Sequence, residues 1–302
     1  MSVIRLAVKV DVDTLLGTRQ GVPRLLEMFN GRGLKASFFL SLGPDNSGRA
    51  VWRVFTRPGF LAKQIRTRAP SSFGWRTLFL GTLLPAPIIG QGQEKLVRSL
   101  IESGHEVGLH AWDHVAWHDR LWRMTGAEIR AEIRRGLEAF TALTGRRPEG
   151  FAAPAWRITA PAVEALAEAG LNYLSATRGT GPYRPLFDGR DYGLLELPTT
   201  LPTADEVLGR DGVTPDNLDT FFLSRMLKPG LHVMTVHAEM EGRGLAKAMA
   251  RILDVCLERG VVFPRLVDLA RECLSRPEDL PRAEVIRTVL PGRPGRVSSQ
   301  GA

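Results

Sequence analysis

The chain has 302 residues, 44% of them hydrophobic and 24% charged, a composition typical of a globular protein with a sizeable core. A net charge of +8 favours anionic partners, and only two cysteines exclude a disulfide framework or a Cys-rich zinc site. No stretch of about 18 apolar residues is present, which excludes a spanning helix, and no cleavable leader precedes the first strand, so we expect a cytoplasmic protein.

Apolar strand-like runs alternate with amphipathic helical segments along most of the chain. We expect strands at 4–12, 35–42, 106–111, around Phe151, and at 171–176, 194–197, 231–237 and 261–263. Helices are expected at 24–29, 94–103, 125–145, 159–169, 214–227 and 242–259, and after Pro264. Repeated β–α units of this kind predict a parallel sheet or barrel. In such a barrel the functional residues gather at the carboxyl ends of the strands.

Three segments break this rhythm. The insertion at about 49–93 is rich in basic and bulky apolar residues, which suits an interfacial segment facing anionic headgroups; a helical hairpin with solvated charges is the alternative. No stacking platform accompanies the charge, so we do not expect nucleic acid as a partner. Residues 177–193 read as a long loop beside the site. The tail 276–302, rich in Arg, Pro, Gly and Ser, is expected to be disordered, so the barrel domain would span 1–275.

Acidic residues and histidines follow two of the predicted strands. Asp11 and Asp13 share one face of the first strand, because strand side chains alternate. His110 and His114 converge if the segment after the third strand is helical. One carboxylate and two imidazoles hold a divalent ion with open positions for water and substrate. The combination therefore predicts a metal-dependent hydrolase.

Each motif alone has a simpler interpretation. Asp-x-Asp at a strand end often caps a turn, because Asp accepts hydrogen bonds from nearby backbone amides. His118 lies four residues beyond His114, so spacing does not decide which histidine pair binds metal.

The segments Val10–Asp13, Gly104–His110, His114 and Val233–His237 together resemble the polysaccharide deacetylase superfamily. The resemblance implies an α/β fold, a distorted (β/α)7 barrel with a divalent metal. By the same resemblance Asp11 is the general base, Asp13, His110 and His114 hold the metal, and His237 is the general acid. The chain departs from the family at Ala152, where many members carry an Arg that tunes the base. Arg157 is a candidate substitute.

Further segments make the resemblance more specific, to one group within the superfamily: Gly43–Asn46, Ala111–His114, Arg178–Thr180, Leu197–Thr203 and His237–Gly242. These segments are similar to the deformylases that act on undecaprenyl phosphate-linked 4-deoxy-4-formamido-L-arabinose for lipid A modification. The resemblance implies release of formate and the aminoarabinose lipid, by an enzyme peripheral on the cytoplasmic face of the inner membrane. Deacetylation of another N-acylated sugar, or a non-catalytic lipid- or sugar-binding module, is the alternative.

Further residues are candidates for substrate contacts. Trp112 and Trp156 would line a tight acyl pocket or would simply pack in the barrel. Arg49, Arg178 and Arg184 are candidates for the carrier phosphate, because a guanidinium matches phosphate geometry, and each is otherwise a solvated charge. Zn, Mn, Co and Ni all accept the expected ligand set, so the sequence leaves the metal unnamed.

Overall fold

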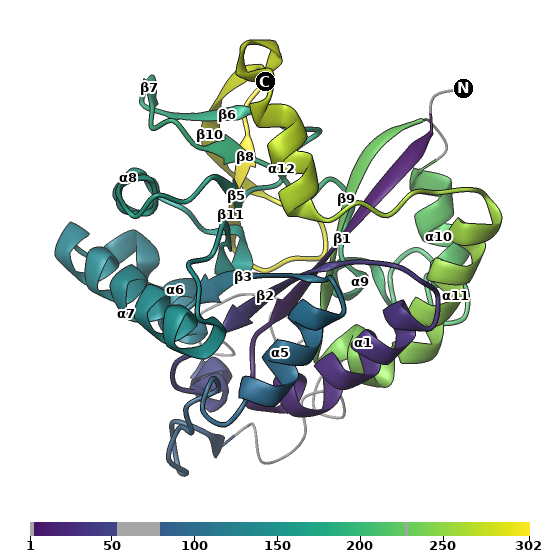
Figure 1. Cartoon of the computed structure of the whole chain (residues 1–302), viewed down its shortest axis with the longest axis horizontal. Coiled ribbons are helices and arrows are strands. Elements are labelled where there is room, and N and C mark those ends of the chain that lie inside the picture. Colours follow the sequence, from purple (N-terminus) through teal and green to yellow (C-terminus); the bar gives the residue numbers. More distant parts are fainter. Residues whose placement is uncertain (1–2, 53–78, 227–228) are drawn as a thin grey trace.

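Seven parallel strands form the central sheet of the computed structural model, which describes residues 3–52, 79–226 and 229–302 (Figure 1). The strand order is β8-β5-β4-β3-β2-β1-β9. Its strands are β1 (Ile4–Val12), β2 (Ser37–Ser41), β3 (Glu106–Ala111), β4 (Gly150–Ala152), β5 (Tyr173–Ser175), β8 (Leu195–Glu196) and β9 (Gly230–His237). All neighbouring pairs run parallel, as expected for β–α repeats.

The sheet curls into an open barrel. Its end strands β8 and β9 are linked through the segment after β8, where the backbone amides of Thr200 and Leu201 donate to Val233 O at 3.1 and 3.2 Å. The expected distorted (β/α)7 barrel is confirmed. Residues 261–263, expected as a strand, contribute only a bridge between Val262 and Arg5.

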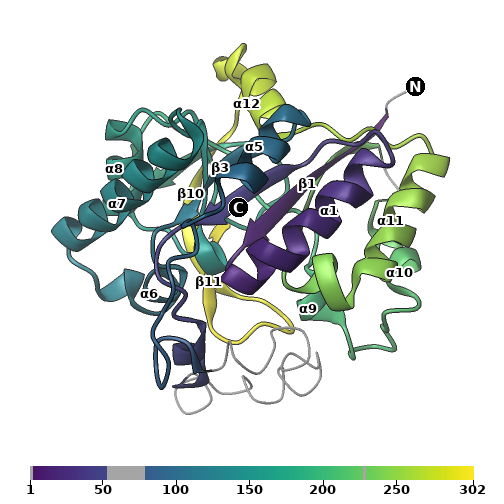
Figure 2. The same ribbon diagram turned by 60° about the horizontal axis from the view of Figure 1, so that its bottom comes forward.

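Helices surround the barrel, and α12 closes the amino-terminal end of its strands (Figure 2). The α-helices are α1 (Val22–Asn30), α5 (Glu94–Glu102), α6 (His114–Arg120), α7 (Gly126–Thr144), α8 (Ala160–Glu168), α9 (Ala204–Val207), α10 (Leu218–Arg225), α11 (Ala246–Glu258) and α12 (Leu266–Leu274). Local sequence explains the bounds of α7: Thr125 and Glu128 form a capping box, and Gly145 ends the helix in the left-handed conformation.

Large aromatic side chains fill the lower barrel, and glycine on neighbouring strands makes room for them. A Cβ on Gly108 would lie 2.5 Å from the ring of Phe39, and a Cβ on Gly150 would lie 2.3 Å from the ring of Tyr173. Ala152 is fully buried in the same cluster. The lower barrel is therefore a packed plug, and the chemistry is expected at the carboxyl-end mouth.

The carboxyl-terminal residues form strands, so the expectation of a disordered tail from Arg276 was wrong. β10 (Arg282–Val289) pairs with β6 (Arg184–Phe187), and β11 (Arg296–Gln300) pairs antiparallel with β10. β6 and β7 (Arg190–Asp191) also give structure to the expected loop 177–193. Val297 and Ser298 are each 1% exposed. Burial of these residues offsets the ordering entropy that a Gly/Pro-rich segment must lose.

Only part of the insertion at 49–93 can be described, because 53–78 lie outside the described residues. Residues 47–52 form a short 3₁₀ helix, and a bridge joins Pro44 to Ile88. Hydrophobic side chains are exposed here: Leu83 is 80% exposed and Phe79 is 41% exposed. No described helix combines the length and the apolar composition needed to cross a bilayer.

Candidate active site at the barrel mouth

The three residues expected to bind metal lie together. Ligand atoms of Asp13, His110 and His114 all fall within 4.8 Å of one another. Asp13 Oδ1 is 3.3 Å from His110 Nε2, and Asp13 Oδ2 is 3.4 Å from His114 Nε2. The two imidazoles are stacked, with ring centroids 5.4 Å apart. The geometry selects His110 and His114 as the pair that faces Asp13, a choice that spacing left open.

Local sequence explains how the two histidines converge. His110 lies in β3 and His114 begins α6, whose N-cap is Asp113: its Oδ1 accepts from the Ala116 amide at 2.9 Å. The helical turn after Asp113 brings His114 back over His110. Buried Glu132 of α7 accepts a hydrogen bond from the Asp113 backbone amide and so holds this turn from behind.

The segment after β2 ties the two metal loops to each other. Asp45 Oδ2 accepts from the Leu15 amide at 2.9 Å, beside the Asp13 loop. Asn46 Nδ2 donates to Asp113 Oδ2 at 2.7 Å, beside the His114 turn. The Gly43–Asn46 segment singled out in the sequence therefore positions ligands contributed by other strands.

Glu239, just after β9, supports the Asp13 loop from below. Its Oε1 accepts hydrogen bonds from the Asp13 amide (3.1 Å), the Thr14 amide (2.8 Å) and the Thr14 hydroxyl (2.8 Å). Burial, reinforced by the charge of Asp13, raises the pKa of Glu239 to about 8. A Cβ on Gly17 would lie 1.9 Å from Glu239 Oε1, so this approach requires glycine. No role was predicted for Glu239 from the sequence beyond its place in the His237–Gly242 segment.

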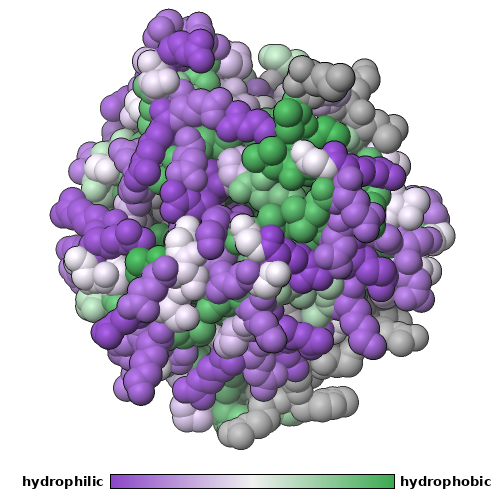
Figure 3. All heavy atoms as spheres, turned by 45° about the vertical axis from the view of Figure 1, so that its right-hand side comes forward, coloured by the Kyte–Doolittle hydropathy of each residue, from purple (hydrophilic) through white to green (hydrophobic). Residues whose placement is uncertain are grey.

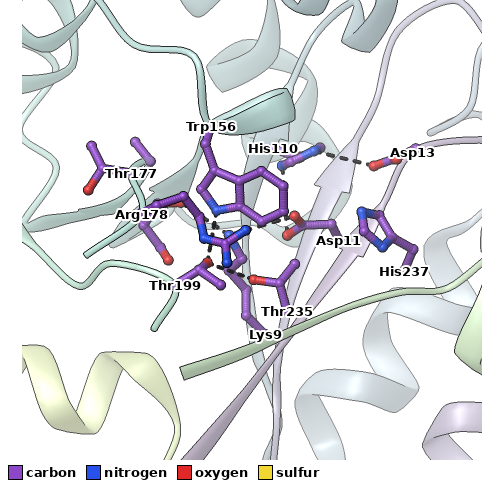
Figure 4. A network of polar contacts seen from close by, with 12 residues as sticks. Lys9, Asp11, Asp13, His110, Trp156, Thr177, Arg178, Thr199, Thr235 and His237 are labelled. Carbon is purple, nitrogen blue, oxygen red and sulfur yellow. Dashed lines mark hydrogen bonds and ion pairs between the residues drawn. The ribbon is translucent and has the colours of Figure 1, made fainter. Parts of the chain in front are cut away.

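The expected base and acid stand side by side on neighbouring strands. Asp11 of β1 and His237 of β9 are register partners, and Asp11 Oδ1 is 4.0 Å from His110 Nδ1 (Figure 4). Burial acts to lower the pKa of His237, but nearby carboxylates, led by Asp205 and Asp13, outweigh it and raise that pKa. The raised pKa favours the protonated imidazole that a general acid needs.

Lys9 is the cation beside Asp11, and it was missed in the sequence. Positions 9 and 11 of β1 face the same side, so Lys9 points into the barrel as Asp11 does. It is fully buried; its Nζ is 3.6 Å from Asp11 Oδ2 and donates to Ser175 O at 3.2 Å. Burial lowers the pKa of Lys9, although Asp11 and Glu196 partly oppose this.

The alternative cation, Arg157, is directed elsewhere. It donates to the backbone oxygen of His118, and its guanidinium lies 4.2 Å from the centroid of the Trp122 ring. Among the described residues, the lysine or arginine that forms an ion pair with Asp11 is Lys9. The structure therefore places Lys9 beside Asp11, whereas the printed contacts of the candidate substitute Arg157 are with His118 and Trp122.

Trp156 lies at the centre of a group of cations. The ring centroid is 5.3 Å from Lys9 Nζ, 4.9 Å from Arg178 Cζ and 4.4 Å from Arg293 Cζ. Its Nε1 donates to Thr199 Oγ1 at 2.9 Å, and Thr199 bonds Thr235 (Figure 4). Trp156 and the preceding Ala155 have φ of 50° and 58°, a left-handed pair that non-glycine residues adopt only under strain.

The remaining candidates occupy different positions. Trp112 is half-buried and packs on Gly43, where a Cβ would lie 2.6 Å from its ring. Arg178 is at the site, but its guanidinium is engaged by Glu206 at 2.8 Å and by Leu201 O at 2.9 Å. Arg49 is exposed and donates to Gly81 O at 2.8 Å. Arg184 pairs with Asp191 in the β6–β7 hairpin at 2.8 Å.

The donor set fits a divalent cation. Asp13 Oδ1 is buried without a hydrogen-bond partner among the described residues, and both histidines present a ring nitrogen to the same point. Burial acts to raise the pKa of Asp13, but His114 and His110 outweigh it and hold that pKa below its usual value. An ionised carboxylate with two imidazoles suits Zn, Mn, Co or Ni.

Comparison with known proteins finds two relatives that are similar over nearly the whole chain. It is 37% identical over 303 residues to a Shewanella sediminis (strain HAW-EB3) protein described as a probable 4-deoxy-4-formamido-L-arabinose-phosphoundecaprenol deformylase ArnD, covering 100% of this chain and 96% of that one. A Wigglesworthia glossinidia brevipalpis protein described in the same words is 32% identical, covering 94% of this chain and 98% of that one.

A similar fold occurs in the crystal structure of a presumed polysaccharide deacetylase from Mycobacterium smegmatis. The TM-score is 0.64 at 21% identity, and the alignment covers 96% of each chain. Residues 9–174, which contain Asp11, Asp13, His110 and His114, match the sequence profile of the polysaccharide deacetylase family. The chain therefore belongs to the polysaccharide deacetylase family.

Proposed function

We propose that this protein hydrolyses the formamide of undecaprenyl phosphate-linked 4-deoxy-4-formamido-L-arabinose in a metal-dependent reaction. The products are formate and the lipid-linked aminosugar, which serves lipid A modification. The observation that carries the proposal is the triad Asp13, His110 and His114 flanked by the register pair Asp11 and His237. The 37% identity to a protein described as a deformylase supports the choice of substrate.

Each residue of the mouth has a chemical task in this reaction. Asp13, His110 and His114 would hold a divalent cation, which would supply Lewis acidity to the formamide and to water at the mouth. Asp11 removes the proton from the attacking water. His237, whose pKa is raised by the surrounding carboxylates, delivers a proton to the departing sugar nitrogen. Trp156 and Trp112 are proposed walls of the acyl pocket.

Lys9 is proposed to position the general base. A buried carboxylate is costly without a partner, and Lys9 Nζ lies 3.6 Å from Asp11 Oδ2. The ammonium is itself held by Ser175 O and the face of Trp156. This arrangement fixes the rotamer of Asp11 toward His110 and leaves Oδ1 available, since that oxygen has no hydrogen bond to a described residue.

The decisive experiment compares acyl groups and carriers. Purified protein, loaded with each candidate metal, is incubated with formamido and acetamido sugars, both lipid-phosphate-linked and free, and the products are followed by mass spectrometry. We expect formate release from the lipid-linked formamido sugar, lost in Asp11→Asn and His237→Ala. Preferred hydrolysis of an acetamido sugar would instead identify a deacetylase. Binding of these sugars without turnover would identify a non-catalytic module.

A cytoplasmic location at the inner-membrane face is also part of the proposal. The exposed Phe79, Leu83, Leu84 and Ile88 follow β2 on the side of the mouth. Two other exposed apolar residues, Val3 and Val262, lie at the opposite end of β1, away from the mouth. The face that carries α10 and α11 is largely hydrophilic around one apolar area (Figure 3). Apolar side chains beside a positively charged body suit an anionic bilayer surface.

Liposome co-sedimentation tests this location. We expect binding to vesicles containing anionic lipid, weakened by added salt. Replacing Leu83 and Leu84 by Ser should weaken binding, whereas replacing Val3 and Val262 by Ser should not. Equal effects of the two pairs would contradict the proposed docking face.

A further inference from the structure

The turn between β10 and β11 brings an arginine to the barrel mouth. Arg293 lies in Leu290–Gly295, whose position beside α9 is visible as the yellow segment in Figure 2. Gly292 has φ of 79°, and a Cβ there would lie 2.0 Å from Glu206 O, so the turn fits α9 only with glycine. Ser298 O accepts from the Arg178 amide at 3.0 Å, and the Gln300 amide donates to Arg178 O at 2.7 Å. The hairpin is therefore fastened to the mouth on both sides of Arg293.

The guanidinium of Arg293 is largely buried but poorly satisfied. Its side chain is 11% exposed. Its nearest carboxylate atom, Glu206 Oε1, is 3.7 Å away, beyond hydrogen-bond distance. It makes no side-chain hydrogen bond within the described part of the chain, although a guanidinium carries five N–H donors. No nitrogen of Arg293 is among the fully buried atoms that lack a partner in the described residues, so its unbonded N–H donors are open to solvent, where an acceptor from outside can meet them.

The carboxylate beside Arg293 is already neutralised. Glu206 accepts two hydrogen bonds from Arg178 Nη1, at 2.8 and 3.0 Å. Arg293 and Arg178 share this carboxylate, and Arg178 holds the closer contacts. Burial lowers the pKa of Arg293, and the attraction of Glu206 and Asp205 does not compensate. Arg293 is therefore the guanidinium of the pair that has donors left for an anion.

The Trp156 indole connects Arg293 to the groups proposed to react, because it contacts both Arg293 and Lys9, the partner of Asp11. The Trp156 centroid is 4.4 Å from Arg293 Cζ and 5.3 Å from Lys9 Nζ, and Lys9 contacts Asp11. In the substrate of the proposed function, one sugar ring separates the formamide from the anomeric phosphate. We propose that Arg293 binds the phosphodiester of the lipid-linked sugar, so that the sugar spans from the hairpin to the Asp11–His237 pair. This inference rests on the proposed function for the identity of the anion.

A binding measurement tests Arg293 independently of turnover. The binding of a short-chain isoprenyl phosphate is measured by calorimetric titration. The unmodified chain is compared with the variants Arg293→Gln and Arg293→Lys. Arg296→Gln is the control, because Arg296 is an exposed arginine on the same hairpin. Loss of a charge-assisted contact predicts affinity about ten- to hundredfold weaker in Arg293→Gln. Arg293→Lys should recover part of it, and Arg296→Gln should bind as the unmodified chain does. Equal affinity in all four proteins would overturn the assignment.

Steady-state kinetics separates binding from a purely structural role. With the lipid-phosphate-linked formamido sugar, Arg293→Gln should raise KM and leave kcat nearly unchanged. With a neutral methyl glycoside of the same sugar, its kcat/KM should match the unmodified chain. A fall in kcat on both sugars, together with a lower Tm, would mean that Arg293 only clamps the hairpin. Phosphate binding by Arg293 in a protein that releases no formate would refute the proposed reaction while leaving the anion site standing.

Discussion

Stability should depend on the protonation of one buried histidine remote from the chemistry. His105 is 2% exposed, between the rings of Phe29 and Phe38, and its Nδ1 accepts from the Ala36 amide at 3.1 Å. Burial, aided by the charge of Lys35, lowers the pKa of His105 from 6.5 to about 4. The unfolded chain thus binds a proton more readily than the folded chain. The contribution of neutral His105 to the free energy of unfolding is therefore fully present above pH 6.5 and is lost as the pH falls toward 4.

The magnitude follows from these two pKa values. Linkage gives a loss of about 2 kcal/mol in the free energy of unfolding between pH 8 and pH 5, and about 3.4 kcal/mol once both states are protonated. His105→Asn keeps an acceptor for the Ala36 amide but does not titrate. The difference in unfolding free energy between the two proteins, from urea denaturation, should therefore shrink by about 2 kcal/mol from pH 8 to pH 5.

Taking the difference between the two proteins removes the contributions of other groups, such as the buried glutamates of the mouth. A difference that stays constant to within about 0.5 kcal/mol over this pH range would refute the reasoning, because His105 would then titrate alike in both states.

Three further outcomes concern the mouth. Glu239→Ala should weaken metal affinity about ten- to hundredfold by releasing the Asp13 loop, measured by competition with a chromophoric chelator; unchanged affinity would contradict this role. Lys9→Met should lower kcat about hundredfold with little change in KM, while Lys9→Arg retains more activity; an equal loss in both would mean that charge is not what matters. Gly292→Ala should raise KM for the lipid-linked sugar and lower Tm, because the new Cβ would lie 2.0 Å from Glu206 O. As a control, Gly189→Ala at the exposed β6–β7 turn should leave KM unchanged, because nothing lies within 4 Å of a Cβ there.

Apolar runs and short motifs were enough to predict the barrel and the cluster of Asp13, His110 and His114 at its mouth. The strands near 4–12 and 106–111 are correct because each is a near-continuous buried run, the pattern of a parallel sheet, and the strand near 231–237 is correct because it contains a shorter buried run. Asp13, His110 and His114 were identifiable because motifs at the carboxyl ends of such strands must converge.

The sequence was less informative where tertiary contacts decide. The tail was expected to be disordered from its Gly and Pro content, yet Gly292 and Gly295 serve a turn with positive φ. Lys9 was missed because a lysine within an apolar strand reads as an exposed position, although alternation from Asp11 places it inside. The role of Glu239 depends on a contact across 226 residues that no local pattern predicts.

The register of β1 against β9 has a consequence for how the site at the barrel mouth is assembled. Asp11 and His237 become neighbours only when the first and last strands of the sheet pair. Asp13 is likewise held by Glu239 from the far end of the barrel. A chain in which β1 and β9 are unpaired can therefore gather Asp13, His110 and His114 but lacks the Asp11–His237 pair beside them. Loss of this one strand pairing would remove the proposed acid–base pair and the Glu239 support of the Asp13 loop together.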